Sequence, residues 1–167
     1  DLSRIDAGAQ PLDLAAVDVG ELLREAVGEA RVHATAAGRR VRFRVDAPVL
    51  PATADPGRLH QVLANLLDNA ARHAFGPGEG GEVWVTWQAL PQGGGELAVS
   101  DNGRPLPLER LNHVFQPLPS GLGLFLAHLD AQWSLAGRLR MELRPEGGKS
   151  FILRLDRQVV DATPAGA

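Results

Sequence analysis

The sequence predicts a two-layer α/β (α+β) sandwich in which about three helices cover one face of a mixed, mostly antiparallel β-sheet. Two long segments repeat apolar residues at helical spacing, and several shorter segments alternate apolar with polar residues as half-buried strands do. Glycine-rich turns join neighbouring strands closely, which favours antiparallel pairs. Helices with one apolar stripe must bury it, and a sheet face is the surface available.

Composition indicates one globular domain. The chain has 167 residues, of which 44% are hydrophobic, and this suffices for a single buried core. The net charge is −3 and the basic residues are scattered, so we expect no nucleic-acid partner. Lysine occurs once, at Lys149, which indicates a coding bias toward arginine more than a binding signal.

Several classes of protein are disfavoured by what the sequence lacks. There is no cysteine, which excludes disulfides, thiolate metal sites and a cysteine nucleophile. No apolar run approaches the roughly 18 residues of a membrane helix, and no leader peptide opens the chain. We therefore expect a cytoplasmic piece of a longer protein, and the sequence leaves open whether that parent protein is anchored in a membrane.

The first predicted helix follows Asp18 and ends at Gly38. Glu21, three residues after Asp18, completes a capping-box pattern. The apolar stripe of this helix comprises Val19, Leu22, Leu23, Ala26, Val27 and Ala30. The segment "RRVRFRVD" (39–46) then alternates apolar residues with arginines and predicts a half-buried strand.

The strongest helix prediction covers residues 55–75, and it has two stripes. Its apolar stripe comprises Leu59, Val62, Leu63, Leu66, Leu67, Ala70 and Ala74, and its polar stripe comprises Gln61, Asn65, Asn69 and Arg72. Asparagine is a mediocre helix former, so a pair in mid-helix suggests a use. Amide oxygens suit Mg²⁺, and arginine can hold phosphate. A solvated helix face is the alternative, and His73 fits a structural role as well as a ligand-facing one.

Four further strands are predicted, and one of them carries a candidate binding residue. The strands are "EVWVTWQAL" (82–90), "ELAVSD" (96–101), "RLRMELR" (138–144) and "SFILRLD" (150–156). Asp101 shares a side of its strand with Leu97 and Val99, so it should enter the covered face of the sheet. A carboxylate there needs donors. These could be the exocyclic amine of adenine or the N–H groups of the "DNG" turn, and taken alone the residues favour the turn.

The segment "GLGLFLA" (121–127) predicts a third helix that begins at a glycine pair. Glycine at a helix start lets a ligand approach the backbone, and helix N-termini attract phosphate. A packing role explains Gly121 and Gly123 equally well when they are considered alone.

Taken in order, these elements resemble the ATP-binding catalytic domain of sensor histidine kinases, in the GHKL superfamily. The resemblance covers roughly residues 1–157. "DPGRLHQVLANLLDNAARHA" (55–74) resembles the N box, "VSDNG" (99–103) the first glycine box, "VFQP" (114–117) the F box and "GLGLFLA" (121–127) the second glycine box. "DLSRIDAG" (1–8) resembles the end of a dimerisation helix.

The resemblance implies a Bergerat-type fold that binds ATP and Mg²⁺. It implies that Asn65 and Asn69 coordinate the metal and that Asp101 accepts a hydrogen bond from adenine. The remaining nucleotide-binding positions it implies are Arg72, His73, Gly103, Gly121, Leu122, Gly123 and Leu124. It assigns no catalytic side chain.

By the same resemblance, residues 1–10 are a remnant of the dimerisation helix, 11–157 form the catalytic domain and 158–167 a disordered tail. The domain would donate the γ-phosphoryl group of ATP to a histidine on its own dimerisation and phosphoacceptor domain, and a response regulator would be the next partner. No histidine of this chain is followed by an acidic residue, as the phosphoacceptor motif requires. We expect the isolated chain to be monomeric.

Two departures from the family pattern keep an alternative open. Pro105 replaces the second glycine of the first glycine box, and proline fixes φ and lacks an N–H. The lid between the F box and the second glycine box shrinks to "QPLPS" (116–120), without basic residues. The alternative is a degenerate GHKL domain that docks kinase helices or a response regulator. A chaperone-type or MutL-type ATPase fits less well, because of the opening "DLSRIDAG".

Overall fold

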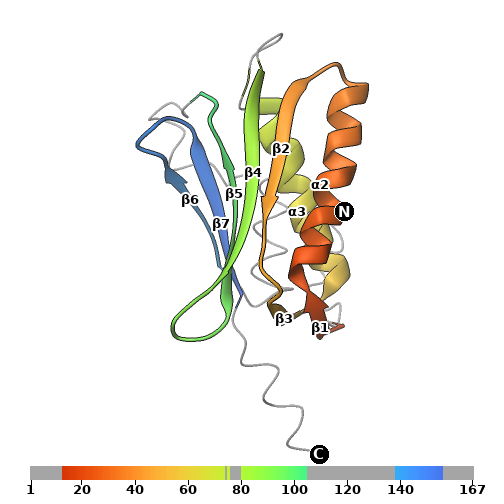
Figure 1. Ribbon diagram of the computed structural model, residues 1–167, viewed down its shortest axis with the longest axis vertical. Coiled ribbons are helices and arrows are strands. Elements are labelled where there is room, and N and C mark those ends of the chain that lie inside the picture. The colour runs from red at the N-terminus through yellow and green to blue at the C-terminus, as the bar shows by residue number, and fades with distance from the viewer. Residues whose placement is uncertain (1–12, 74, 76–79, 105–137, 156–167) are drawn as a thin grey trace, which may run out of the picture.

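The computed structural model describes residues 13–73, 75, 80–104 and 138–155. Its main sheet has five strands in the order β2-β4-β5-β7-β6, and β1 pairs with β3 in a separate two-stranded ribbon (Figure 1). The elements are β1 (Ala15–Asp18), α2 (Val19–Ala36), β2 (Arg40–Asp46), β3 (Pro51–Ala54), α3 (Pro56–His73), β4 (Gly80–Ala89), β5 (Gly95–Asp101), β6 (Arg138–Leu143) and β7 (Lys149–Leu155).

The sheet is mixed and mostly antiparallel, as the sequence predicts. β2 runs parallel to β4, whereas the pairs β4–β5, β5–β7 and β6–β7 are antiparallel. The parallel pair requires a crossover, and α3 supplies it between β2 and β4. Tight turns suffice for the antiparallel β4–β5 and β6–β7 hairpins, which explains why glycine-rich segments marked them in the sequence.

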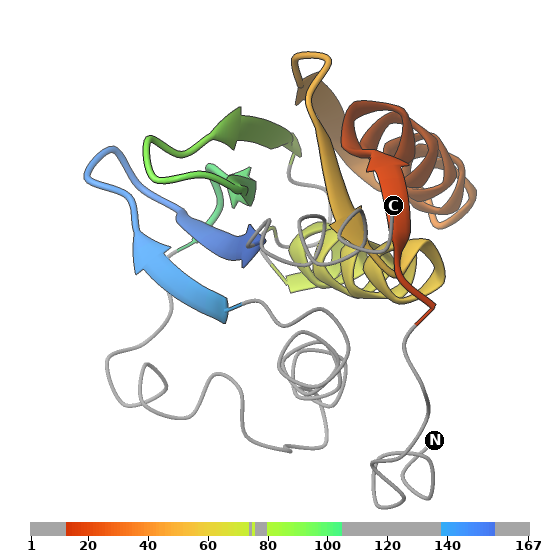
Figure 2. The same cartoon turned by 90° about the horizontal axis from the view of Figure 1, so that it is seen from below.

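Helices α2 and α3 lie side by side on one face of the sheet, which gives the two layers (Figure 2). α2 packs against β2, and α3 packs against β4 and β5. The buried residues of α3 that form the centre of the core are Leu59, Val62, Leu63, Leu66, Leu67 and Ala70. These belong to the apolar stripe predicted from the sequence, so the helix lies with its predicted face toward the sheet.

The predicted helices and strands are confirmed wherever the structure describes them. The third helix, expected to begin at Gly121, lies outside the described residues, as do the predicted dimerisation remnant (1–10) and tail (158–167). Within the described part, no helix is both long enough and apolar enough to cross a membrane.

Both helices begin at an aspartate whose side chain accepts backbone hydrogen bonds. Asp18 Oδ1 accepts from the N–H of Glu21 at 3.1 Å, on the surface. Asp55 is buried, with 8% of its surface exposed. It accepts from the N–H of Arg58 at 3.1 Å and from the N–H of Asp13 at 3.0 Å. The Asp55 carboxylate therefore caps α3 and also holds the segment that leads into β1.

We expect Asp55→Ala to destabilise the domain by about 2 kcal/mol, because an N-cap is lost and the N–H groups of Arg58 and Asp13 both lose their acceptor. Asp18→Ala serves as the matched control. It removes an exposed cap and should lower the free energy of unfolding by only about 1 kcal/mol. Urea denaturation followed by circular dichroism measures both variants. Equal losses would contradict the second role of Asp55.

The face of the sheet opposite the helices carries charged and polar side chains. Arg140 on β6 bonds Glu142 at 3.1 Å and, across β7, Glu96 at 3.2 Å. The hydrogen bond that Arg140 donates to Glu142, followed by its bond to Glu96 and the charge of Glu96, raises the pKa of the Arg140 guanidinium. These partly exposed ion pairs lie on the solvent-facing side of the sheet, whereas the hydrophobic core lies on the side that the helices cover.

Candidate functional site

Asn65 and Asn69 lie one turn apart on α3, on the polar stripe predicted from the sequence. Both residues are partly buried, between the fully buried apolar stripe and the exposed side of the helix. Among the described residues, no hydrogen bond or ion pair involves either amide. Two amide groups therefore lie on adjacent turns at the edge of the buried face, and amide oxygens are ligands that suit a hard cation.

Arg72 lies one turn beyond Asn69, on the exposed side of α3. It bonds Asp68 Oδ2 at 3.1 Å in an i,i+4 pair, and both side chains are 56% exposed. The two residues line a groove of about 320 Å³ between α2 and α3. An exposed pair of this kind contributes little to stability. His73 is the last residue of α3.

Asp101 ends β5 and lies buried on the face of the sheet that α3 covers. It is 1% exposed, on the same side of the strand as Leu97 and Val99, which confirms the predicted orientation. Its Oδ1 accepts a hydrogen bond from the Gly103 N–H at 2.9 Å. The turn that the sequence favoured is therefore present. Oδ2 is buried and has no partner in hydrogen-bond geometry in the described part of the chain.

Lys149 approaches Asp101 closely, and sequence reasoning attached no role to this lysine. Its Nζ lies 3.2 Å from Asp101 Oδ2, within ion-pair distance but outside hydrogen-bond geometry. The two side chains are 3% and 1% exposed. A buried lysine needs a counter-charge. The sequence signal that could have pointed to this pair is therefore a single lysine placed directly before a predicted strand.

The turn between β6 and β7 packs against the end of β5 and fixes Asp101. Arg144 donates from Nη1 to the carbonyl oxygen of Asp101 and to that of Gly147, both at 3.1 Å. Its guanidinium also stacks on Trp84 of β4, 4.4 Å from the ring centroid. Arg144 thereby links β4, β5 and the β6–β7 turn, at the end of the sheet where α3 ends (Figure 1).

The second glycine box lies outside the described residues. This part contains Gly121, Leu122, Gly123 and Leu124, together with the lid and Pro105. Their proposed part in nucleotide binding stays a prediction. The described half of the site thus consists of the amide pair on α3, the Asp101 carboxylate with Gly103, and the unforeseen Lys149.

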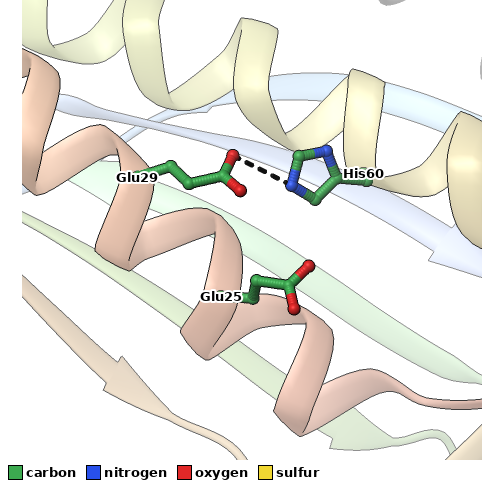
Figure 3. Close-up of side chains that lie close together, drawn as sticks. All are labelled: Glu25, Glu29 and His60. Atoms are coloured by element: carbon green, nitrogen blue, oxygen red, sulfur yellow. Dashed lines mark ion pairs between the residues drawn. The ribbon is translucent and has the colours of Figure 1, made fainter.

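A second polar cluster joins the two helices. Glu25 and Glu29 of α2 lie beside His60 of α3, and His60 Nε2 is 3.1 Å from Glu29 Oε1 (Figure 3). The nearest ligand atoms of the three residues lie within 4.8 Å of one another. The glutamates are exposed and the imidazole is 30% exposed, so this is a contact between the helices near the surface, and it is an ion pair only when His60 is protonated.

Comparison with known proteins places this chain in a family. Residues 54–159 match the model of the histidine kinase-, DNA gyrase B- and HSP90-like ATPase family. The alginate biosynthesis sensor protein KinB of Pseudomonas aeruginosa is 33% identical over 164 residues, which cover 92% of this chain and 26% of KinB. The histidine-protein kinase AfsQ2 of Streptomyces coelicolor is 31% identical, over 93% of this chain and 29% of AfsQ2.

A solved histidine kinase structure has the same fold as this chain. The catalytic domain of the histidine kinase ThkA superposes with a TM-score of 0.76 at 25% identity, and the match covers 87% of this chain and 97% of that domain. The chain therefore spans a small part of its sensor-kinase relatives but nearly the whole of one catalytic domain. It belongs to the histidine kinase-, DNA gyrase B- and HSP90-like ATPase family, as the ATP-binding catalytic domain of a two-component sensor kinase.

Proposed function

We propose that this domain binds ATP with Mg²⁺ and donates the γ-phosphoryl group to a histidine of its kinase's phosphoacceptor domain. One observation carries the proposal: Asp101, buried on the helix-covered face, keeps one carboxylate oxygen without a hydrogen-bond partner among the described residues. The Lys149 ammonium, 3.2 Å away, balances the charge of Oδ2, and a carboxylate oxygen can accept a further hydrogen bond. The exocyclic amine of adenine would donate that bond.

The amides of Asn65 and Asn69 would hold the metal. They are partly buried, lie on adjacent turns and have no partner in the described part of the chain, so their oxygens fit a hard cation. When bound, Mg²⁺ would neutralise charge on the phosphates. Arg72, Gly121, Leu122, Gly123 and Leu124 would hold the phosphates beside it, together with His73.

In this proposal the chain's own residues position ATP and perform no covalent chemistry. Asp101 fixes the base, and the cationic and backbone N–H groups orient the triphosphate for in-line attack by the acceptor imidazole. The phosphorylated histidine would then pass its phosphoryl group to a response regulator. The proposed partners of this chain are therefore the dimerisation and phosphoacceptor domain of its own kinase and that response regulator.

Calorimetric titration with ATP, in Mg²⁺ and in EDTA, tests the proposal. We expect binding that depends on Mg²⁺ and weakens roughly tenfold or more in Asn69→Ala, because one metal ligand is lost. His60→Ala is the matched control on the same helix, since His60 contacts Glu29 of α2 instead of the proposed site. Its affinity should equal that of the wild type.

Transfer is measured separately, by mixing the domain with its kinase's phosphoacceptor domain and γ-labelled ATP. Label on the acceptor histidine supports the proposed transfer of the γ-phosphoryl group. An absence of ATP binding at millimolar concentration would reject the nucleotide site and favour a docking module.

A further inference from the structure

The contact between α2 and α3 brings together three side chains of the kinds that bind transition metals. Glu25 and Glu29 lie one turn apart on α2, so their carboxylates share one face of that helix. His60 approaches them from the first part of α3. One ligand atom of each residue lies within 4.8 Å of the other two (Figure 3). Two helices therefore place two oxygen ligands and one nitrogen ligand close to a single point.

The negative charge of this cluster exceeds what its histidine can balance. Two carboxylates at this separation repel each other. A protonated imidazole supplies one positive charge, and the partner of His60 is Glu29. Among the described residues, Glu25 has no hydrogen bond or ion pair. A divalent cation between the helices would balance both glutamates.

The geometry at His60 Nε2 differs from that of a hydrogen bond. This atom is buried and lies 3.1 Å from Glu29 Oε1, yet within the described part of the chain it has no partner in hydrogen-bond geometry. In a hydrogen bond the acceptor lies close to the line of the N–H. Two atoms that bind one tetrahedral ion lie about 3.3 Å apart, and each points at the ion instead of at the other. The short distance without alignment fits two ligands of one ion.

We propose that Glu25, Glu29 and His60 bind a divalent transition-metal ion, with Zn²⁺ as the occupant, and that this ion fastens α2 to α3. His60 would bind through Nε2 and each glutamate through one oxygen, which leaves a fourth position for water. An imidazole with carboxylates suits Zn²⁺, whereas Mg²⁺ prefers oxygen ligands alone. The ligand set therefore selects a different metal from the one proposed beside the nucleotide.

The proposed zinc site is separate from the proposed nucleotide site. His60 and Asn69 both lie on α3, and their spacing corresponds to about two and a half turns of the helix. The two side chains therefore leave α3 on opposite sides. Zinc binding does not depend on the nucleotide, and Asn69→Ala should bind Zn²⁺ as the wild type does.

Calorimetric titration of the nucleotide-free domain with Zn²⁺, in buffer without Mg²⁺ or chelator, tests the inference. We expect one ion per chain, with a dissociation constant on the order of micromolar. Binding of Mg²⁺ alone should be weaker by roughly a hundredfold or more. Glu25→Gln and His60→Ala should each weaken Zn²⁺ binding at least tenfold, because each removes a ligand. Glu25→Gln changes an exposed side chain without a partner in the described part of the chain, so it should fold normally.

The matched control is His33→Ala, which removes an exposed histidine of α2 one turn after Glu29 and should keep wild-type Zn²⁺ affinity. Thermal denaturation gives a second measurement. Zn²⁺ at about a hundred times its dissociation constant should raise the Tm of the wild type by roughly 5 °C or more. It should raise the Tm of Glu25→Gln much less.

Two results would overturn the inference and leave the proposed function standing. The first is wild-type Zn²⁺ binding no tighter than Mg²⁺ binding. The second is a loss of Zn²⁺ affinity in His33→Ala equal to the losses in Glu25→Gln and His60→Ala, since Zn²⁺ would then bind surface histidines without selection. Failure of the domain to bind ATP would reject the proposed function and leave the zinc site standing.

Discussion

Asp101→Ala is expected to destabilise the domain by about 3–5 kcal/mol and to weaken ATP binding. The loss of stability follows from Lys149, whose ammonium stays buried after its counter-charge is removed. The Gly103 N–H also loses its acceptor. The hydrogen bond that the carboxylate would accept from the adenine amine is charge-assisted, and its loss corresponds to roughly 10- to 100-fold in affinity.

A double variant separates these two effects. In Asp101→Ala/Lys149→Met both charges are removed, and methionine keeps most of the aliphatic volume of lysine. Replacing a buried ion pair by apolar groups is often close to neutral, so the double variant should regain most of the stability that Asp101→Ala loses. ATP binding should stay weak, because the acceptor for the adenine amine is still absent.

Urea denaturation measures the stability of the wild type, both single variants and the double variant, and calorimetry measures ATP affinity. The expected coupling makes the double variant more stable than Asp101→Ala alone. Additive losses would contradict an energetic role for the pair. Recovery of ATP binding in the double variant would contradict the assignment of Asp101 to the base.

The layers and the faces on which Asn69 and Asp101 lie could be predicted because their signals are local. The apolar and polar stripes of α3 repeat within one helix, so Leu66 and Asn69 could be placed on different faces before any tertiary contact was known. The position of Asp101 followed from strand alternation in the same way. The helical period and the strand alternation of side-chain directions hold in the folded protein, because they depend on backbone geometry alone.

The partner of Asp101 could not be predicted because it depends on register between distant strands. Lys149 lies 48 positions after Asp101, and β6 pairs with β7 as well, so the sequence does not say which residue of β7 faces the end of β5. A shift of one residue would point Ser150 toward the helices and Lys149 toward the open face. The register sets the environment of Asp101, and long-range packing sets the register.

Gly148→Ala is expected to destabilise the domain by roughly 2–5 kcal/mol, since it combines backbone strain with a steric clash. Gly148 has φ +87°, a conformation that residues with a side chain rarely adopt. A Cβ at this position would lie 2.0 Å from the carbonyl oxygen of Asp101. That oxygen belongs to the backbone and accepts the bond from Arg144, so it cannot simply rotate away.

Gly147→Ala is the matched control, one residue earlier in the same turn. Gly147 also has positive φ, +109°, but a Cβ there would meet nothing within 4 Å. It should therefore lose only about 1–3 kcal/mol of stability, from strain alone. Urea denaturation gives the difference between the two variants, which reports the clash with Asp101. Because the clash displaces the residue proposed to bind adenine, Gly148→Ala should also weaken ATP binding at least tenfold more than Gly147→Ala. Equal affinities in the two variants would show that the β6–β7 turn does not position Asp101 for the nucleotide.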